Sequence, residues 1–182
     1  MQSALPTVTS VRIKSVMTGG ISTFYDTINE VVSSEVTEDN LLQQLKRADR
    51  NERVLFFGDD IWDPMFGSYF DESRTHYTGD TTDLDSSDAS VAIDLMRTLQ
   101  NHSNFKLLLA HVIGIDSAGH TFDSQDAAIE KKIKDVESVI KHTIDVMDQD
   151  TTLIVFGDHG MTSDGNHGGD SLLELSTVFF AY

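Results

Sequence analysis

Two short polar segments, each following an apolar run, carry the side chains best suited to chemistry. GIDSAGH contains Asp116 and His120, GDHGM contains Asp158 and His159, and His167 follows in NHGGD. Carboxylate and imidazole groups are the ligands that a catalytic zinc-class ion uses. Open α/β sheets place their sites at the carboxyl ends of strands, so the position of these segments after apolar runs predicts a metal site.

The two segments differ in how strongly they favour a metal. Asp116 and His120 are four residues apart and would share one face of a helical turn, although a polar loop with Asp116 as a helix cap would read the same way. Asp158 and His159 are adjacent on a turn between two glycines, and they come directly after the run TTLIVF. Six such ligands would suit two ions roughly 4 Å apart, an arrangement used for displacement at phosphorus. Five of the six can be named here.

A covalent route through such a site also needs a nucleophile. The chain has no cysteine, so the nucleophile must be a hydroxyl group that a metal activates. The segment PTVTS offers Thr7, Thr9 and Ser10 just before a predicted helix. A threonine in that position is also a common N-cap, and this role stays open on position alone.

Composition limits the classes of function. The 182 residues are 39% hydrophobic, which suits one domain with a core. Thirty acidic residues against 13 basic ones give a net charge of −17 with no basic patch, which argues against nucleic-acid binding. The absence of cysteine excludes disulfides and thiolate zinc sites. No apolar run approaches the roughly 18 to 20 residues of a membrane span, and there is no signal-peptide pattern.

The elements that must position these residues alternate between helix and strand. Predicted helices cover about 11–17, ending at Gly19 and Gly20, 38–50 with Thr37 as N-cap, 62–66, 86–100 and 129–147. Predicted strands cover 54–57, 106–112, 151–156 and 175–182. The strands at 106–112 and 151–156 should form a right-handed parallel crossover through the long helix between them. We therefore expect an α/β fold around one mostly parallel sheet with helices on both faces, cut from a longer chain at both ends.

Taken together, these motifs resemble a known group of enzymes. The order of hydroxyl before a helix, GxDxxGH, GDHGM and HGGD resembles the alkaline phosphatase superfamily, in its nucleotide pyrophosphatase and phosphodiesterase branch. The stretches PTVT, TGG before STFYD, EDNLLQQL, FFGDDIW and GDHGMTSDGNHGGDS resemble the GPI ethanolamine phosphate transferases, in particular their third-mannose type. The resemblance extends over nearly the whole chain.

The resemblance assigns roles to the candidate residues. Thr9 matches the nucleophile, while Asp116, His120 and His167 match one zinc site. Asp158 and His159 match part of a second site, which the family completes with an aspartate from a strand upstream of the nucleophile. Residues 1–182 would then be part of a single alkaline phosphatase-like catalytic domain that lacks this N-terminal strand and a C-terminal membrane region. Two divalent metal ions are the implied cofactors, with zinc as the expected ion.

The resemblance also implies a reaction and a setting. Phosphoethanolamine would pass from phosphatidylethanolamine to Thr9 and then to a mannose of the GPI glycolipid precursor. The segment would face the lumen of the endoplasmic reticulum, held at the membrane by regions outside it, with a possible membrane partner subunit and no nucleic acid. Asn101 begins an N-x-S sequon that could be glycosylated there.

Three points stay open at the level of sequence. Asp59, Asp60 and Trp62 in GDDIW could bind ethanolamine or glycan, or could form a turn at a strand end with a packed Trp. The same core motifs would serve a metal-dependent phosphodiesterase or pyrophosphatase that passes the group to water. The chain could also be a non-catalytic scaffold domain that binds metal, which is the third open point.

Overall fold

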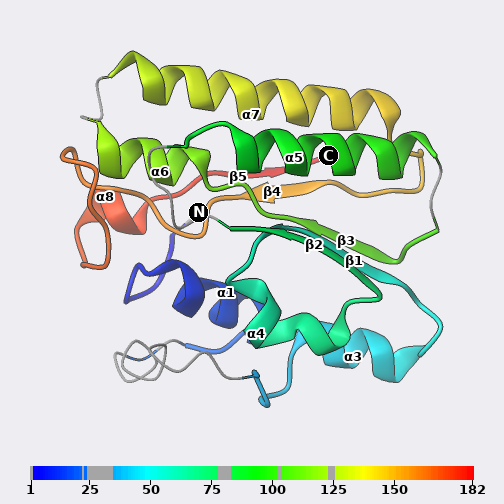
Figure 1. Ribbon diagram of the computed structural model, residues 1–182. Helices are drawn as coiled ribbons and strands as arrows, with labels where there is room; N and C mark the ends of the chain where they lie inside the picture. Colours follow the sequence, from blue (N-terminus) through cyan, green and yellow to red (C-terminus); the bar gives the residue numbers. More distant parts are fainter. Residues whose placement is uncertain (1, 22, 24–34, 78–82, 102–103, 123–125) are drawn as a thin grey trace.

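A parallel sheet with helices on both faces forms the centre of the chain (Figure 1). The computed structural model describes residues 2–21, 23, 35–77, 83–101, 104–122 and 126–182. Strand β1 (Val54–Asp59) lies between β2 (Glu72–His76) and β3 (Leu107–Ala110), and both pairings are parallel. The predicted α/β class with a mostly parallel sheet is therefore confirmed.

Alternate side chains of β1 enter two different apolar clusters. Phe56 faces the side where α1 (Thr9–Thr18), α3 (Leu41–Ala48), α4 (Trp62–Phe66) and the 3₁₀ turn η1 (Gly67–Tyr69) pack. Leu55 and Phe57 face the opposite side and contact Val91 of α5 (Ser86–Gln100). All six residues of β1 are buried, as expected of a central parallel strand.

Helices α6 (Gly114–Thr121) and α7 (Ala127–Val146) complete the layer that contains α5 (Figure 1). The sequence predicts that the isoleucine face of α7 is buried and its charged face exposed. This is wrong at two positions: the Ile133 residue is 52% exposed, whereas Lys132 is 2% exposed. Lys132 is buried because it pairs with a carboxylate on α5, which fixes how the helix is rotated.

The C-terminal strands form a second, separate sheet. Strand β4 (Ile154–Phe156) pairs antiparallel with β5 (Phe179–Ala181), and a short helix, α8 (Leu172–Leu175), precedes β5. The predicted parallel crossover between 106–112 and 151–156 is wrong, because β3 and β4 share no hydrogen-bonded ladder. The crossover rule applies only to strands of one sheet. Periodicity identifies a strand but does not say which strand it pairs with.

Most predicted helix bounds are confirmed, and the errors have local causes. The first helix ends at Gly19, whose left-handed φ of 68° closes it. Helix α3 begins later than the predicted helix at 38–50 because Asn40, not Thr37, caps it by accepting a hydrogen bond from the Gln43 amide. Strand β2 was missed because its sequence, ESRTH, is polar. No helix of the described residues is long and apolar enough to cross a membrane.

Candidate metal centre

Helix α6 presents Asp116 and His120 on one face. Asp116 lies in the first turn of the helix and His120 lies one turn later. Asp116 Oδ2 is 3.4 Å from His120 Nε2. The four-residue spacing therefore produces the shared face that the sequence predicts.

A buried ion pair fixes where α6 begins. Asp88 of α5 accepts hydrogen bonds from the Ile113 and Gly114 amides, at 3.0 and 3.1 Å, through Oδ1. Its Oδ2 lies 3.0 Å from Lys132 Nζ of α7, and Lys132 also donates to the Leu84 carbonyl at 2.6 Å. A Cβ on Gly114 would lie 2.2 Å from Asp88 Oδ2 and 2.4 Å from Lys132 Cε. Gly114 is thus required by close packing, and three helices are joined at the first turn of α6.

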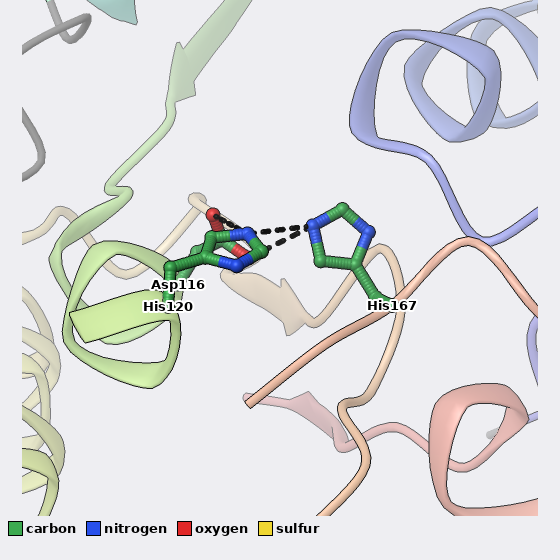
Figure 2. Close-up of side chains that lie close together, drawn as sticks. All are labelled: Asp116, His120 and His167. Carbon is green, nitrogen blue, oxygen red and sulfur yellow. Dashed lines mark hydrogen bonds and ion pairs between the residues drawn. The ribbon is translucent and has the colours of Figure 1, made fainter. Parts of the chain in front are cut away.

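His167 reaches the same place from a distant part of the chain (Figure 2). Its Nε2 lies 3.0 Å from His120 Nε2 and 3.5 Å from Asp116 Oδ1. Its Nδ1 lies 2.6 Å from the Thr7 carbonyl oxygen. A carbonyl can only accept, so Nδ1 carries the proton and Nε2 presents its lone pair to the other two side chains. A hydrogen-bonded carbonyl behind a histidine is also the usual support for a metal ligand.

The spacing of these candidate ligand groups suits a single metal ion. Bonds of about 2.0 to 2.1 Å at tetrahedral angles put ligand atoms about 3.3 to 3.4 Å apart. The two histidine Nε2 atoms are 3.0 Å apart, while His120 lies 3.4 Å from Asp116 Oδ2 and His167 lies 3.5 Å from Asp116 Oδ1, the other oxygen of the carboxylate. One ligand atom from each of the three residues lies within 4.8 Å of the other two, which leaves room for an ion between them. Asp116 Oδ1 is buried without a hydrogen-bond partner, although buried carboxylate oxygens are normally satisfied. The donor set and this oxygen both fit a zinc-class cation.

The second predicted group lies beside the first. The His159 side chain is 4% exposed, and its ring stacks on that of His167 with centroids 4.0 Å apart and planes at 22°. Its Nδ1 lies 2.9 Å from the Gly160 carbonyl, so its Nε2 lone pair faces the Thr9 hydroxyl at 3.2 Å. Asp158 Oδ2, buried without a hydrogen-bond partner, lies 3.4 Å from the same Nε2. The structure thus brings all five predicted ligands and Thr9 together.

The two groups are not equally complete. Within the described residues, a set of three ligands is found only for Asp116, His120 and His167. Asp158 and His159 supply two ligands to the second group. Helix α1 adds the buried Arg12, whose pKa is lowered by burial while the charge of Asp158 acts to raise it.

The N-terminal segment clamps the loop that carries His167. Thr7 is fully buried; its hydroxyl accepts from the Gly168 amide at 2.7 Å and donates to the Gly169 carbonyl at 3.0 Å. Glu174 accepts from the Gly169 amide at 2.7 Å, and the Ser171 hydroxyl and this amide lower the pKa of Glu174. The sequence offered Thr7 only as a possible nucleophile, and its role as a clamp follows from the structure.

The sequence did not predict the other residues that support the site, because no local sequence pattern marks them. Ser3 donates its hydroxyl to the Asp158 carbonyl at 2.8 Å and its amide to the Leu175 carbonyl at 2.7 Å. Asp88 and Lys132 look like ordinary surface charges in two helices. The capping box formed by Ser171 and Glu174 has the pattern S-x-x-E, which could have predicted α8.

The GDDIW residues lie at the end of β1 and in the turn that follows it. Trp62 is 7% exposed, packs on Phe56 and Phe66, and meets the edge of His111. Asp59 is 4% exposed and accepts from the Ile61 amide. These contacts favour the turn with a packed Trp. Burial raises the pKa of Asp60, and so does the hydrogen bond that protonated Asp60 donates to Asp59.

Asn101 is an exposed residue that ends α5. The other two positions of its sequon, 102 and 103, lie outside the described residues, as does most of the STFYD stretch. Glycosylation of Asn101 stays a prediction.

Comparison with known proteins agrees with this geometry. Residues 1–176 match the model of the type I phosphodiesterase / nucleotide pyrophosphatase family. The chain belongs to this family. In this member of the type I phosphodiesterase family, Asp116 and His120 lie on α6 after β3, and Asp158 and His159 follow β4.

Within the family the chain is similar to GPI ethanolamine phosphate transferases. It is 37% identical to the human "GPI ethanolamine phosphate transferase 3, catalytic subunit" over 97% of its length, and 36% identical to the Schizosaccharomyces pombe transferase 3 over the same share. Identity to the human "GPI ethanolamine phosphate transferase 2, catalytic subunit" is 32% over 94% of the chain. The chain spans only 16%, 19% and 18% of these relatives.

Proposed function

We propose that this chain is part of the catalytic domain of an enzyme that transfers phosphoethanolamine from phosphatidylethanolamine to a mannose of the GPI precursor. The observation that carries the proposal is the Thr9 hydroxyl, 3.2 Å from His159 Nε2 and beside the ligand set of Asp116, His120 and His167. Similarity to two types of GPI ethanolamine phosphate transferase supports the choice of substrates.

The chain's own residues would perform the first half of the reaction as follows. Thr9 Oγ1 attacks the phosphorus of phosphatidylethanolamine, the Oγ1–P bond forms, and the bond from phosphorus to the diacylglycerol oxygen breaks. The proton lost by Thr9 passes through the site to that leaving oxygen. Thr9 is the first residue of α1, so the unpaired amides and the dipole of the helix favour the anionic phosphoryl group.

The second half reverses the roles. A mannose hydroxyl attacks the phosphorus of phospho-Thr9, the new O–P bond forms, and the bond to Oγ1 breaks. The proton of the mannose hydroxyl restores the Thr9 hydroxyl. Atoms and charge balance, and the enzyme returns to its starting form.

Metal ions fit this scheme through the residues already described. Asp116, His120 and His167 would hold one ion, and Asp158 and His159 would contribute to a second, with zinc as the expected metal. Such ions lower the pKa of an attacking hydroxyl and neutralise charge on phosphoryl oxygens. The full-length protein would act at the endoplasmic reticulum membrane with this domain in the lumen, anchored by regions outside residues 1–182. This setting leaves room for a membrane partner subunit.

The test uses the full-length protein with phosphatidylethanolamine labelled in its head group. Thr9→Ala should abolish labelling of the protein and transfer to the glycolipid while keeping the metal, and Thr9→Ser should retain part of both. His167→Ala should lose metal and transfer together. Thr18→Ala, at the other end of α1, is the matched control and should behave as the unchanged protein.

The outcome also separates the two rival functions. Undiminished transfer in both Thr9→Ala and His167→Ala would refute the assignment. Label released as free phosphoethanolamine despite acceptor would indicate a hydrolase. Metal binding without labelling of Thr9 would indicate the scaffold domain.

A further inference from the structure

A polar cleft of about 290 Å³ adjoins α6 on the side next to the metal ligands. The end of β2 contributes Thr75 and His76, the start of α5 contributes Ser86 and Ser87, and α6 contributes Ser117. Ser117 directly follows Asp116 in the helix, so the cleft and the metal-ligand set occupy neighbouring faces of the same turn. Nothing described above for Thr9 or the metal ligands uses this cleft.

Two buried polar atoms of the lining have no hydrogen-bond partner. These are His76 Nε2 and Ser87 Oγ. Asp94 Oδ2 is the acidic atom paired with His76 Nε2, but at 4.0 Å it is too far to accept a hydrogen bond. Asp94 is already held by Arg74 and Arg97. Since nearly all buried polar atoms are satisfied, the two atoms indicate that a polar ligand belongs in the cleft.

The charges around the cleft exclude an anion. Among the described residues, no lysine or arginine lines it. Asp83 lies at its edge, and hydrogen bonds from Ser86 lower the pKa of Asp83, which keeps it charged. Asp59 ends the strand beside His76. A phosphate group would therefore be repelled, whereas a neutral ligand rich in hydroxyls would not.

Hydroxyl groups dominate the remaining surface. Ser87 and Ser117 each bring a hydroxyl that can both donate and accept. The hydroxyls of Thr75, Ser86 and Ser90 already donate to Asp63, Asp83 and the Ser86 carbonyl, so they can accept from a ligand. Tyr77 stands at the rim with 79% of its surface exposed, and its ring offers an apolar face with a polar tip. The volume is at the low end for ligand pockets, which suits a single sugar ring better than a lipid.

We propose that this cleft binds a sugar residue of the acceptor glycan, through hydrogen bonds to His76 Nε2 and Ser87 Oγ. The inference rests on the proposed transferase function and names the acceptor side of that reaction. An ethanolammonium group would be drawn to Asp83 at the edge of the cleft, whereas the carboxylate nearest His76 Nε2, Asp94, is neutralised by two arginines. The position of Ser117 beside Asp116 brings the glycan next to the metal-ligand set without involving it in metal binding.

The experiment measures the two half-reactions separately in the full-length enzyme. Labelling of Thr9 by phosphatidylethanolamine, without acceptor, reports the donor step. Initial rates over a series of glycolipid concentrations report KM for the acceptor. We expect Ser87→Ala and His76→Gln to raise the acceptor KM about 3- to 10-fold each, the effect of one lost hydrogen bond. Labelling of Thr9 and metal content should stay within twofold of the unchanged enzyme.

Ser138→Ala is the matched control, because this serine lies on α7 away from the cleft. It should change neither half-reaction. Slower labelling of Thr9 with an unchanged acceptor KM would overturn the proposal and assign the cleft to the donor. An equal loss of rate in both half-reactions would show that the two residues only support the structure, and it would overturn the proposal. No change in either half-reaction would overturn the proposal as well. Absence of Thr9 labelling in the unchanged enzyme would instead refute the proposed function, and the assignment of the cleft with it.

Discussion

Replacing Thr7 by valine should loosen the loop that carries His167. Valine has the shape of threonine but lacks the hydroxyl, so the Gly168 amide and the Gly169 carbonyl lose their buried partner. Each buried group left unsatisfied costs about 1 to 3 kcal/mol, and two give about 2 to 6 kcal/mol before relaxation. The carbonyl of Thr7 that accepts from His167 Nδ1 is retained, because it belongs to the backbone.

We expect this change to weaken zinc binding about 10- to 100-fold. That range is typical for the loss of a group that orients a metal ligand, and it corresponds to about 1.4 to 2.8 kcal/mol. The expected loss is therefore smaller than the disturbance calculated from the contacts, as it should be if the loop relaxes in part. The measurement is a competition between a zinc chelator and the full-length protein.

Thr143→Val is the control for this experiment. Thr143 is also buried, at 6% exposed, but its hydroxyl donates to the Val139 carbonyl inside α7. That carbonyl keeps its helical hydrogen bond, so zinc affinity should stay within twofold. Wild-type zinc affinity in a folded Thr7→Val protein would refute the clamp. An equal drop in both variants would show loss of general stability, not loss of ligand positioning.

Three further predictions concern the supports of the site. Asp88→Ala removes one of the two carboxylates that pair with the buried Lys132, and it leaves the Ile113 and Gly114 amides without their acceptor. It should lower the free energy of unfolding by about 3 to 5 kcal/mol. Asp135→Ala, in an exposed pair, should lower it by less than about 0.5 kcal/mol, and thermal inactivation of the two variants compares them. Gly114→Ala places a methyl 2.2 Å from Asp88 Oδ2 and should lower the inactivation temperature at least as far as Asp88→Ala, so a smaller effect would contradict the packing described. The pKa of Glu174 is lowered in the fold, so its stabilisation is complete above the unfolded pKa of about 4.3 and disappears as pH falls through the folded value. Glu174→Gln should therefore flatten the acid side of the pH–stability curve, and an unchanged curve would show that this carboxylate is not involved.

The sequence predicted the candidate ligands better than it predicted the pairing of strands. Asp116, His120, Asp158 and His159 follow apolar runs directly, so local pattern and the strand-end rule were enough to place them. His167 needed only the loop that brings it back. Local information sufficed for the four residues on α6 and after β4, whereas His167 is also held by Thr7, 160 positions away in the sequence.

The features that the sequence did not predict depend on contacts between elements that are distant in the chain. The sequence predicted that Lys132 lies on the solvent-exposed face of α7, and only the position of Asp88 on α5 explains its burial. Strand β2 is polar and pairs with β1 through backbone groups, which leave no trace in side-chain periodicity. The unpartnered atoms of His76 and Ser87 likewise become visible only when β2, α5 and α6 have been placed together.

The clamp between Thr7 and Gly169 joins positions that are 162 residues apart. A ribosome adds about 5 to 20 residues per second, so the beginning of α1 waits about 8 to 32 s before its partner has been synthesised. During that interval Thr9 has no His159 beside it, and the site does not yet exist. The order of synthesis therefore means that this centre cannot form before Gly169 has been added, and a product truncated after α7 would retain Thr9, Asp116 and His120 but lack His159 and His167.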